Sequence, residues 1–380
     1  MKLDEVTGVV KEPRTFAPSP LLPTNDFVGV EVELEGFAFQ REWRFESNFW
    51  DVKDDPSLRG GGKEFLYHAP LNGEDVITSL SEFDTFIEWY EDHYGKDKID
   101  CSERTSVHVH LDVRNMTSQQ LLNLGLVNMT FEPALLRVFG PGREDSNYCL
   151  PMSKGTDRFR LAGLMKDDIP SVITALNSSK YSSFNTLPVK TQGSVEFRIH
   201  VGTKNGSDLM NWICVILWMK KYAMEMEVDW VKYPEYVSEM GMDQYVRLVF
   251  KDRAEQFLYQ GYQEDLYNGT RVAQDTVIRN KLKEAHLEAV SKEGENPAAA
   301  LFAEKHSEDV GMPVEDEDEP KLRVEMGEWN FPDPAGGRIP PKPRVANPLH
   351  DLDDLFDMGA VAEQEDEDEE DDDEPDRGDF

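Results

Sequence analysis

The chain contains little that would bind nucleic acid. Its 380 residues include 75 acidic but only 40 basic ones, which gives a formal net charge of −35. No segment is rich in lysine and arginine, so the chain lacks the cations that neutralise a phosphate backbone. We therefore expect no nucleic-acid partner.

Cysteine and long apolar runs are also scarce. Cys101, Cys149 and Cys214 lie far apart without a CxxC pair, which indicates neither a disulfide framework nor a zinc knuckle. The most apolar run, 212–219, is shorter than the about 20 residues that a membrane helix needs. The first residues, MKLDEVTGVVKEP, carry acids where a secretory signal would be apolar. These features predict a cytoplasmic protein with free thiols and no membrane partner.

The acidic residues are spread unevenly along the chain. Residues 291–380 contain 30 acidic and 8 basic residues, whereas the preceding 290 residues contain 45 and 32. Beyond Gly294 the apolar periodicity ends, and proline, glycine and acidic residues become frequent. Such a segment buries too little apolar surface to offset the entropy lost on ordering. We therefore predict a disordered acidic tail over 295–380.

The rest of the chain divides into a short arm and one folded domain. Residues 1–25 are punctuated by proline, which predicts a loose N-terminal arm, and residues 26–294 form the predicted domain. Within the tail, the segment LHDLDDLFDMGA at 349–360 sets Leu, Phe and Met among acids. It either forms a short helix that binds a protein partner or only keeps the tail soluble.

Strand and helix patterns alternate through the folded domain. Period-two alternation predicts strands in FVGVEVELEGFAF (27–39), KEFLYHAPL (63–71), VHVHLDV (107–113) and GSVEFRIHVGT (193–203). Helical spacing predicts helices over 75–95, 118–140, 207–226, 242–260 and 271–293. This order predicts an α+β fold, in which helices flank a sheet that has one apolar and one wet face.

The first predicted strand carries three acids on its wet face. Glu31, Glu33 and Glu35 alternate with apolar residues, and neighbours on one face lie roughly 6–7 Å apart. Carboxylates this close repel one another and raise each other's pKa values, a cost that bridging divalent cations would remove. The alternative is a solvent-facing strand whose acids only keep it soluble.

The third predicted strand carries a pair of histidines. His108, His110 and Asp112 share one face, although β-branched residues are preferred in strands. An HxH pair of this kind can serve a metal or a phosphate group. The alternative is a surface pair without a role.

The fourth predicted strand combines an acid with a guanidinium group. Glu196, Arg198 and His200 are expected to share a face, so the acid could hold a metal while Arg198 meets an anion. The alternative is a surface ion pair, which contributes little to stability.

A fourth acid, Glu64, lies at the start of the second predicted strand. Glu64 follows a glycine triplet at 60–62, and the turn sequence DPSL begins at Asp55. The predicted strands thus bring several acids and imidazoles to one sheet. Oxygen ligands with an imidazole suit Mg²⁺ or Mn²⁺ better than zinc.

Taken in order, these motifs resemble those of a known family. The order GxExE, then DxSL with a following Glu, then HVH, then VEFR is similar to that of the amidoligases. This family belongs to the carboxylate–amine ligase superfamily, together with glutamine synthetase and γ-glutamylcysteine synthetase. The resemblance covers about 27–225 and is supported by NYCLP at 147–151, with Arg143 before it, and by KYSSFN at 180–185.

The resemblance implies a glutamine-synthetase-like catalytic fold, a curved and mainly antiparallel sheet that holds two or three divalent ions. By motif position, Glu33 and Glu64 would hold the ion nearer the reacting carboxylate. The ion that bridges the ATP phosphates would be held by Glu31, His108 and Glu196. The resemblance also implies a bacterial cell, or one infected by a phage, as the protein's location.

The resemblance assigns roles to three further residues. His110 and Arg198 would contact phosphate oxygens of ATP, Arg198 at the transferred phosphoryl group, and Asp55 would be the base for the attacking amine. The family usually has GLHVH where this chain has Ser106 and Val107 before its first histidine, so the backbone approach to the nucleotide would differ here.

The implied activity is an ATP-dependent ligase that joins a carboxylate to an amine through an acyl phosphate. The acid and the amine could each be a small molecule, a peptide or a protein. Two other interpretations remain open at this point. One is a divalent-metal-dependent hydrolase, because HxH with carboxylates can also activate water. The other is a non-catalytic acidic interaction protein.

Overall fold

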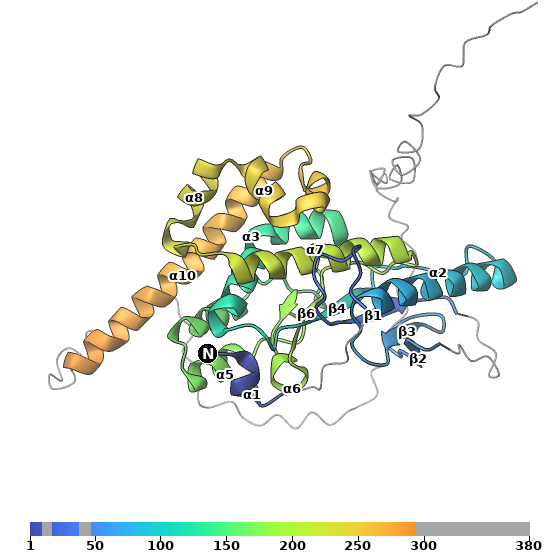
Figure 1. Cartoon of the computed structure of the whole chain (residues 1–380), viewed down its shortest axis with the longest axis horizontal. Coiled ribbons are helices and arrows are strands. Elements are labelled where there is room, and N and C mark those ends of the chain that lie inside the picture. Colours follow the sequence, from blue (N-terminus) through green and yellow to red (C-terminus); the bar gives the residue numbers. More distant parts are fainter. Residues whose placement is uncertain (10–16, 38–46, 294–380) are drawn as a thin grey trace, which may run out of the picture. The chain divides into compact units, whose positions relative to one another are not determined.

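The structure is a computed structural model that describes residues 1–9, 17–37 and 47–293 (Figure 1). The predicted tail at 295–380, with its 349–360 segment, lies outside the described residues. The described strands form one sheet: β1 (Val28–Leu34), β2 (Trp50–Asp54), β3 (Lys63–Tyr67), β4 (Val107–Asp112), β5 (Phe184–Asn185) and β6 (Ser194–Phe197).

The strand order places segments from distant parts of the chain side by side. The order is β2-β3-β1-β4-β6-β5, and every pairing in it is antiparallel. The α+β class and the mainly antiparallel sheet are therefore confirmed. The four predicted strands correspond to β1, β3, β4 and β6, whereas β2 and β5 were not predicted. Strand β5 has only two residues, and β2 has only Trp50 and Val52 as apolar positions, which gives almost no periodic signal.

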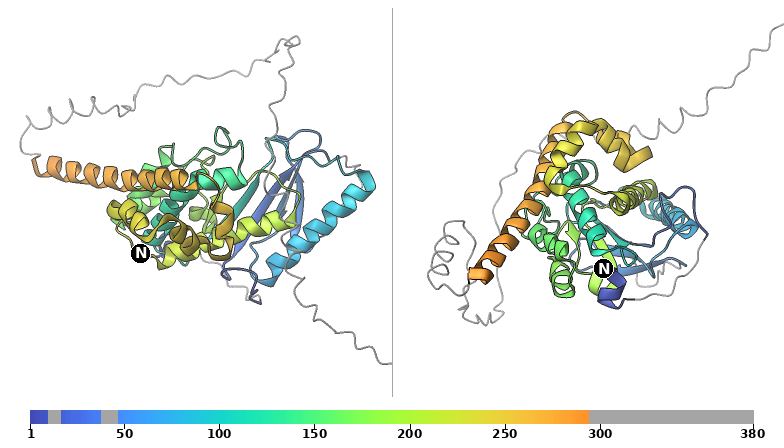
Figure 2. Two further views of the ribbon diagram at one scale, coloured as in Figure 1. Left: turned by 90° about the horizontal axis from the view of Figure 1, so that it is seen from above. Right: turned by 60° about the vertical axis from the view of Figure 1, so that its left-hand side comes forward.

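One face of the sheet forms the centre of the hydrophobic core. Val30, Val32 and Val109 are at most 1 % exposed, as are the other apolar residues that alternate with the polar ones on β1 and β4. Each side chain of this kind contributes roughly 1.5–3 kcal/mol through burial. Helices α2 (Glu74–Tyr94) and α7 (Gly206–Glu225) lie along this face (Figures 1 and 2).

The remaining long helices pack behind α7. Helix α3 (Ser118–Phe139) begins with a capping box of Thr117 and Gln120, and α10 (Tyr262–Glu293) runs beside it (Figure 1). Besides the N-terminal α1 (Leu3–Thr7), the shorter described helices are α4 (Asp157–Leu161), α5 (Ile169–Ala175), α6 (Val189–Gln192), α8 (Tyr233–Met240) and α9 (Met242–Phe250), with 3₁₀ turns η1 (Ala162–Lys166), η2 (Trp230–Lys232) and η3 (Lys251–Phe257). The predicted helix at 242–260 is thus α9 followed by η3.

Residues 1–9 differ from the loose arm that was predicted for residues 1–25. Helix α1 (Leu3–Thr7) docks on the domain, and Leu3 is only 1 % exposed. The Leu3 amide donates to the Met116 carbonyl at 3.0 Å, and the Ser118 amide donates to the Met1 carbonyl at 3.0 Å. Proline punctuation therefore did not reveal that this segment has an apolar anchor.

Helix α7 contains the apolar run 212–219, which is too short to span a membrane. Among the described residues, no helix combines the length and the apolar character needed to span a bilayer. Trp212 and Ile213 in this run are fully buried. The run therefore belongs to the protein core.

Candidate functional site

The face of the sheet opposite the core carries the predicted site residues. The strand register places Glu31 opposite His108, His110 opposite Glu196, and Glu33 opposite a residue of β3, Glu64. Opposed residues on one face lie only about 4.5–5.5 Å apart at Cβ. Residues predicted from separate chain segments are thus neighbours across β3, β1, β4 and β6.

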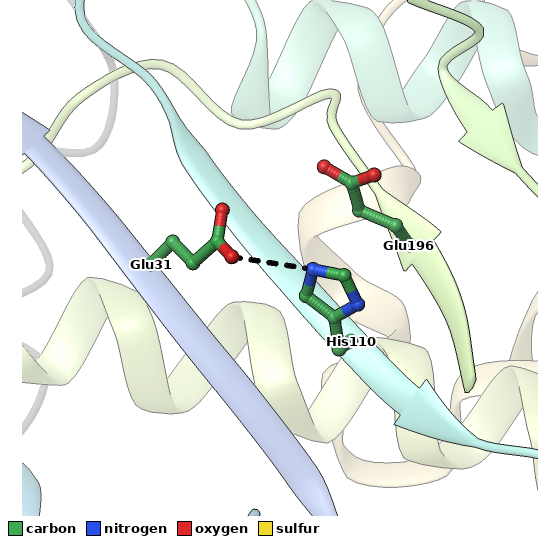
Figure 3. A group of neighbouring side chains, drawn as sticks. All are labelled: Glu31, His110 and Glu196. Carbon is green, nitrogen blue, oxygen red and sulfur yellow. Dashed lines mark ion pairs between the residues drawn. The ribbon is translucent and has the colours of Figure 1, made fainter. Parts of the chain in front are cut away.

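The tightest group consists of two carboxylates and an imidazole. Glu31, His110 and Glu196 each offer a ligand atom, and these atoms all lie within 4.8 Å of one another (Figure 3). His110 Nε2 is 3.4 Å from Glu31 Oε1. Two oxygen ligands and one nitrogen ligand fit Mg²⁺ or Mn²⁺, because these cations accept carboxylate ligands with an occasional imidazole.

His108, which was predicted as a metal ligand, lies beside the same carboxylates. Its Nδ1 is 3.2 Å from Glu31 Oε2 and 3.5 Å from Glu196 Oε1. The other ring nitrogen, Nε2, lies 2.8 Å from the Ser106 hydroxyl, which donates to Glu33 Oε2 at 2.5 Å. Both histidines therefore have a nitrogen within reach of a cation held by Glu31 and Glu196.

The hydrogen bonds of Ser106 determine which His108 nitrogen carries a proton. An ionised carboxylate only accepts, so Ser106 donates to Glu33 and accepts from His108 Nε2. In the imidazolium form Nδ1 donates to Glu31 Oε2, whereas in the neutral ring it directs a lone pair toward the oxygens of Glu31 and Glu196. Three acceptors face one another there, and only a proton, a cation or the nearby Arg198 Nη1, 3.4 Å away, can relieve their repulsion.

The charges of this group shift its pKa values. Burial by itself would raise the pKa of Glu31, but hydrogen bonds and charge from His108 and His110 outweigh burial and hold that pKa well below its usual range. Burial opposes the protonation of His110, yet the Glu31 carboxylate outweighs burial and raises the His110 pKa. The site therefore favours an ionised Glu31 carboxylate beside positive charge.

The pKa of Glu64 shifts upward, in the opposite direction to that of Glu31. Burial raises its pKa, and the negative charges of Glu31, Glu33 and Asp55 raise it further. Glu64 thus lies in a field of carboxylates that a cation would neutralise. The structure brings these four acids within electrostatic range.

Asp55 lies in the turn that joins β2 to β3. Its carboxylate Oδ1 accepts the Ser57 amide at 2.8 Å, and its own amide donates to the Gly62 carbonyl at 3.3 Å. Gly61 has φ +78°, and a Cβ there would lie 2.4 Å from the Phe37 carbonyl oxygen. The glycine triplet therefore permits the tight turn that places Asp55 near Glu64.

Arg198 follows the last residue of β6 and is only partly exposed. Its guanidinium pairs with Glu196, and its Nε donates to the Tyr148 carbonyl at 3.4 Å. The Asn185 amide donates to Glu196 Oε2 at 2.7 Å. Asn185 and Ser106 were not among the predicted site residues. For Ser106 a signal existed, because it lies two residues before His108 and so continues the same strand face.

Two residues leave the face on which they were predicted. Glu35 is 4 % exposed and accepts the Arg59 amide at 2.7 Å, so it supports the glycine turn instead. His200 packs against Phe139 and Trp212, with ring centroids 5.4 and 5.9 Å apart. Val109 pairs with Phe197, and Ser106 pairs with Val201. Three residues of chain thus separate the pairs on the β4 side but four on the β6 side. This one-residue bulge turns His200 into the core.

A cavity of about 260 Å³ adjoins the group at the N-terminal end of β1. Its lining includes Glu31 and His110, the polar residues Arg114 and Ser194, and apolar residues such as Leu66. A Cβ on Gly29, which also lines it, would come within 3.3 Å of the His110 side chain. The cavity could thus accept a ligand that reaches the candidate metal group.

Comparison with protein-family models gives no match for this chain, and comparison with curated proteins gives none. The resemblance to the amidoligases and the roles it implies for the site residues therefore stay predictions.

Proposed function

We propose that this protein is an ATP-dependent carboxylate–amine ligase with a glutamine-synthetase-like fold. The observation that carries the proposal is the group of Glu31, His110 and Glu196 on the open face of an antiparallel sheet. His108 and Arg198 adjoin this group, and a cavity opens beside it. A cation site next to a phosphate-binding guanidinium is what phosphoryl transfer needs.

The residues divide into two sets on this proposal. Glu31, Glu196 and one or both histidines hold the cation that contacts ATP. Glu33 and Glu64, which face each other across β1 and β3, hold a second cation nearer the acid substrate. When bound, such cations withdraw charge from phosphate and carboxylate oxygens.

The chemistry then proceeds in two steps. A carboxylate oxygen of the acid attacks the terminal phosphorus of ATP, the bond to the bridging oxygen breaks, and ADP leaves. The acyl phosphate that forms is attacked at its carbonyl carbon by the amine, and phosphate leaves with the electron pair. Arg198 holds the transferred phosphoryl oxygens, and His110 does so as well when His108 alone binds the cation. Asp55 accepts the proton that the amine loses.

The cavity beside His110 suits the nucleotide on this proposal. It lies at the end of the group remote from Glu33, so ATP phosphates that extend from it would reach Glu31 before the second cation site. Leu66 and the other apolar residues of its lining offer a surface for the base, and Ser194 offers a hydroxyl.

The test of this function is binding of Mn²⁺ and ATP, followed by electron paramagnetic resonance and calorimetry. We expect ATP to bind tightly only with Mn²⁺ or Mg²⁺, and Glu31→Gln to weaken this binding at least about tenfold. Glu88→Gln, which changes an exposed acid of α2, is the matched control. Circular dichroism shows whether each variant is folded.

The other two interpretations give different results in the same experiment. A metal-dependent hydrolase would bind Mn²⁺ with no effect of ATP, and a non-catalytic interaction protein would bind neither. If ATP binds with Mn²⁺, ADP release with pooled acids and amines then identifies the substrates. Failure of ATP to bind the folded protein would disprove the ligase.

A further inference from the structure

The last turns of α10 extend beyond the folded domain. At Asn280 the helix still packs on the domain, because the Asn280 side-chain amide donates to the Ala162 carbonyl at 3.3 Å. From residue 285 to residue 289 every side chain is exposed, and this end of the helix projects away from the other helices (Figures 1 and 2). Most helical stability comes from packing of an apolar face, so a partner along this segment would stabilise it.

An apolar stripe runs along this part of α10. Its members follow one another at intervals of four, three and four residues: Ile278, Leu282, Ala285 and Ala289. This is the spacing of the a and d core positions of a coiled coil, with Leu282 and Ala289 at a. Leu282 is 65 % exposed, the largest value among the exposed large apolar residues that the structure describes. Its own domain therefore does not cover the centre of the stripe.

The stripe faces away from the domain. At 3.6 residues per turn, Asn280 lies on nearly the opposite side of the helix from Leu282 and Ala285. Ala273 and Val277, which are at most 2 % exposed, share the side of Asn280. A second helix can therefore approach the stripe from the side that the domain leaves open.

The stripe is complementary to itself when a second copy lies antiparallel. Leu282 of one copy then lies opposite Ala285 of the other, and Ile278 lies opposite Ala289. Each of the four layers thus sets a large side chain against a small one, an arrangement that lets facing helices interdigitate. Another copy of this chain therefore fits the stripe in shape.

The charges beside the stripe favour the same orientation. Lys281 and Glu288 each precede an a position, and these flanking positions face each other in an antiparallel pair, so Lys281 of one copy lies beside Glu288 of the other. A parallel pair would instead set Lys281 beside His286, which offers no carboxylate. Exposed charges can serve more than one partner, so a contact of Glu288 within its own chain is compatible with this pair.

We propose that α10 is a self-association surface, through which two copies of the chain pair antiparallel about a two-fold axis. Four layers make a smaller interface than the roughly 1,200–2,000 Å² of a standard one, so the dimer dissociates on dilution in the micromolar range. The inference is independent of the ligase, because none of the candidate site residues lies on α10.

Sedimentation velocity of the full-length protein, from about 1 to 500 µM, measures this pairing. We expect monomer to give way to dimer, with half of the dimer dissociated between roughly 5 and 200 µM. Leu282→Ser should raise the dissociation constant at least about tenfold, because it removes the leucine from two layers. Leu287→Ser is the matched control, since Leu287 is 51 % exposed on the same helix but lies about 140° around it from Leu282.

Charge reversal tests the orientation of the two helices. At low salt, Lys281→Glu should weaken the dimer by about three- to tenfold, because it sets two carboxylates beside each other at both ends of the pair. Adding Glu288→Lys to this variant should restore the wild-type dissociation constant. Failure of the double variant to regain association would overturn the antiparallel arrangement.

Two other results would overturn the self-association itself. The first is a protein that stays monomeric up to 500 µM, which would leave the stripe to another segment of the chain or to a different protein. The second is a dimer that Leu282→Ser weakens no more than Leu287→Ser does. Both leucines are exposed, so circular dichroism should show that each variant is folded.

Discussion

At the scale of single residues, Ser106 connects the two halves of the candidate site. Its hydroxyl contacts both Glu33, which is assigned to one cation, and His108, which is assigned to the other. Because the same hydroxyl fixes the protonated nitrogen of His108, it determines whether Nδ1 can bind a cation. Ser106, at the position where the chain departs from the family pattern, thus becomes part of the site.

We predict that Ser106→Ala weakens Mn²⁺ binding by roughly 10- to 100-fold, the usual effect of removing a group that orients a metal ligand. The free energy of unfolding should fall by only about 1–2 kcal/mol, because one hydroxyl is lost. Paramagnetic resonance titration measures the affinity, and urea denaturation measures the stability. Ser102→Ala, which removes a hydroxyl from the loop before β4, is the control; equal affinity in both variants would contradict the prediction.

The sequence predicted correctly which face a side chain lies on where the alternation within one strand determines that face. The alternation in β1 and β4 placed Glu31, Glu33, His108 and His110 on one face, and the structure agrees. It failed for His200, because the extra residue that turns this ring inward depends on how β6 pairs with β4. Pairing is a property of two segments, and a single period cannot reveal it.

At the scale of elements, the contact between α2 and α7 includes a carboxylate at the start of a helix. Asp84 on α2 accepts the Gly206 amide at 2.6 Å, at the first residue of α7. A Cβ on Gly206 would lie 2.5 Å from the Asp84 carboxylate, so glycine permits this close approach. The positive end of the α7 dipole favours the ionised Asp84 carboxylate. Asp84 is half-buried, however, and burial disfavours the ionised form.

This contact gives a pH-dependent stability of known sign. Burial raises the pKa of Asp84 above the ordinary value of 3.8, although the Gly206 hydrogen bond opposes the shift. The folded state therefore binds this proton more tightly than the unfolded state, and the contribution of Asp84 to stability falls as the pH rises through this range. Asp84→Asn cannot ionise but keeps an acceptor for Gly206.

We predict that Asp84→Asn loses less stability than the wild type as the pH rises from about 4 to 7. Urea denaturation at several pH values gives the free energy of unfolding for each protein. Asp92→Asn, an exposed position on the same helix, should follow the wild type. A steeper loss in Asp84→Asn would show that the carboxylate is stabilised rather than penalised.

Element boundaries were harder to predict than the existence of elements. Helices α2, α3 and α7 were predicted within a few residues, because each has a long apolar stripe. Helix α10 begins at Tyr262 rather than 271, since its first turns carry many polar residues. Helix α8 was missed because Tyr233 and Val237 alone indicate its buried side, which is too few for a periodic signal.

At the scale of the whole molecule, the proposed cation sites would offset part of the acidic composition. The domain gathers Glu31, Glu33, Glu64 and Glu196 on one face, where their mutual repulsion opposes folding. A cation that binds only the folded state stabilises it by an amount that depends on its concentration relative to its dissociation constant. The stability of the protein should therefore depend on divalent ions.

We predict that Mn²⁺ at 100 times its dissociation constant raises the free energy of unfolding by about 2.7 kcal/mol. The melting temperature should rise with Mn²⁺ in the wild type and in Glu88→Gln, but much less in Glu31→Gln. Differential scanning calorimetry measures all three. An equal rise in Glu31→Gln would place the cation elsewhere, for example among exposed acids.

The site is assembled from segments that are remote in sequence. His108 and Glu31 are 77 residues apart, and Glu196 comes from a strand that follows a further long stretch of chain. Closing loops of this length costs entropy that only the finished sheet repays, so such pairing forms slowly. On the proposed function, a newly synthesised chain could therefore not hold the cation until β6 has left the ribosome and joined β4. Occupancy of the metal group would then mark the moment at which the sheet is complete.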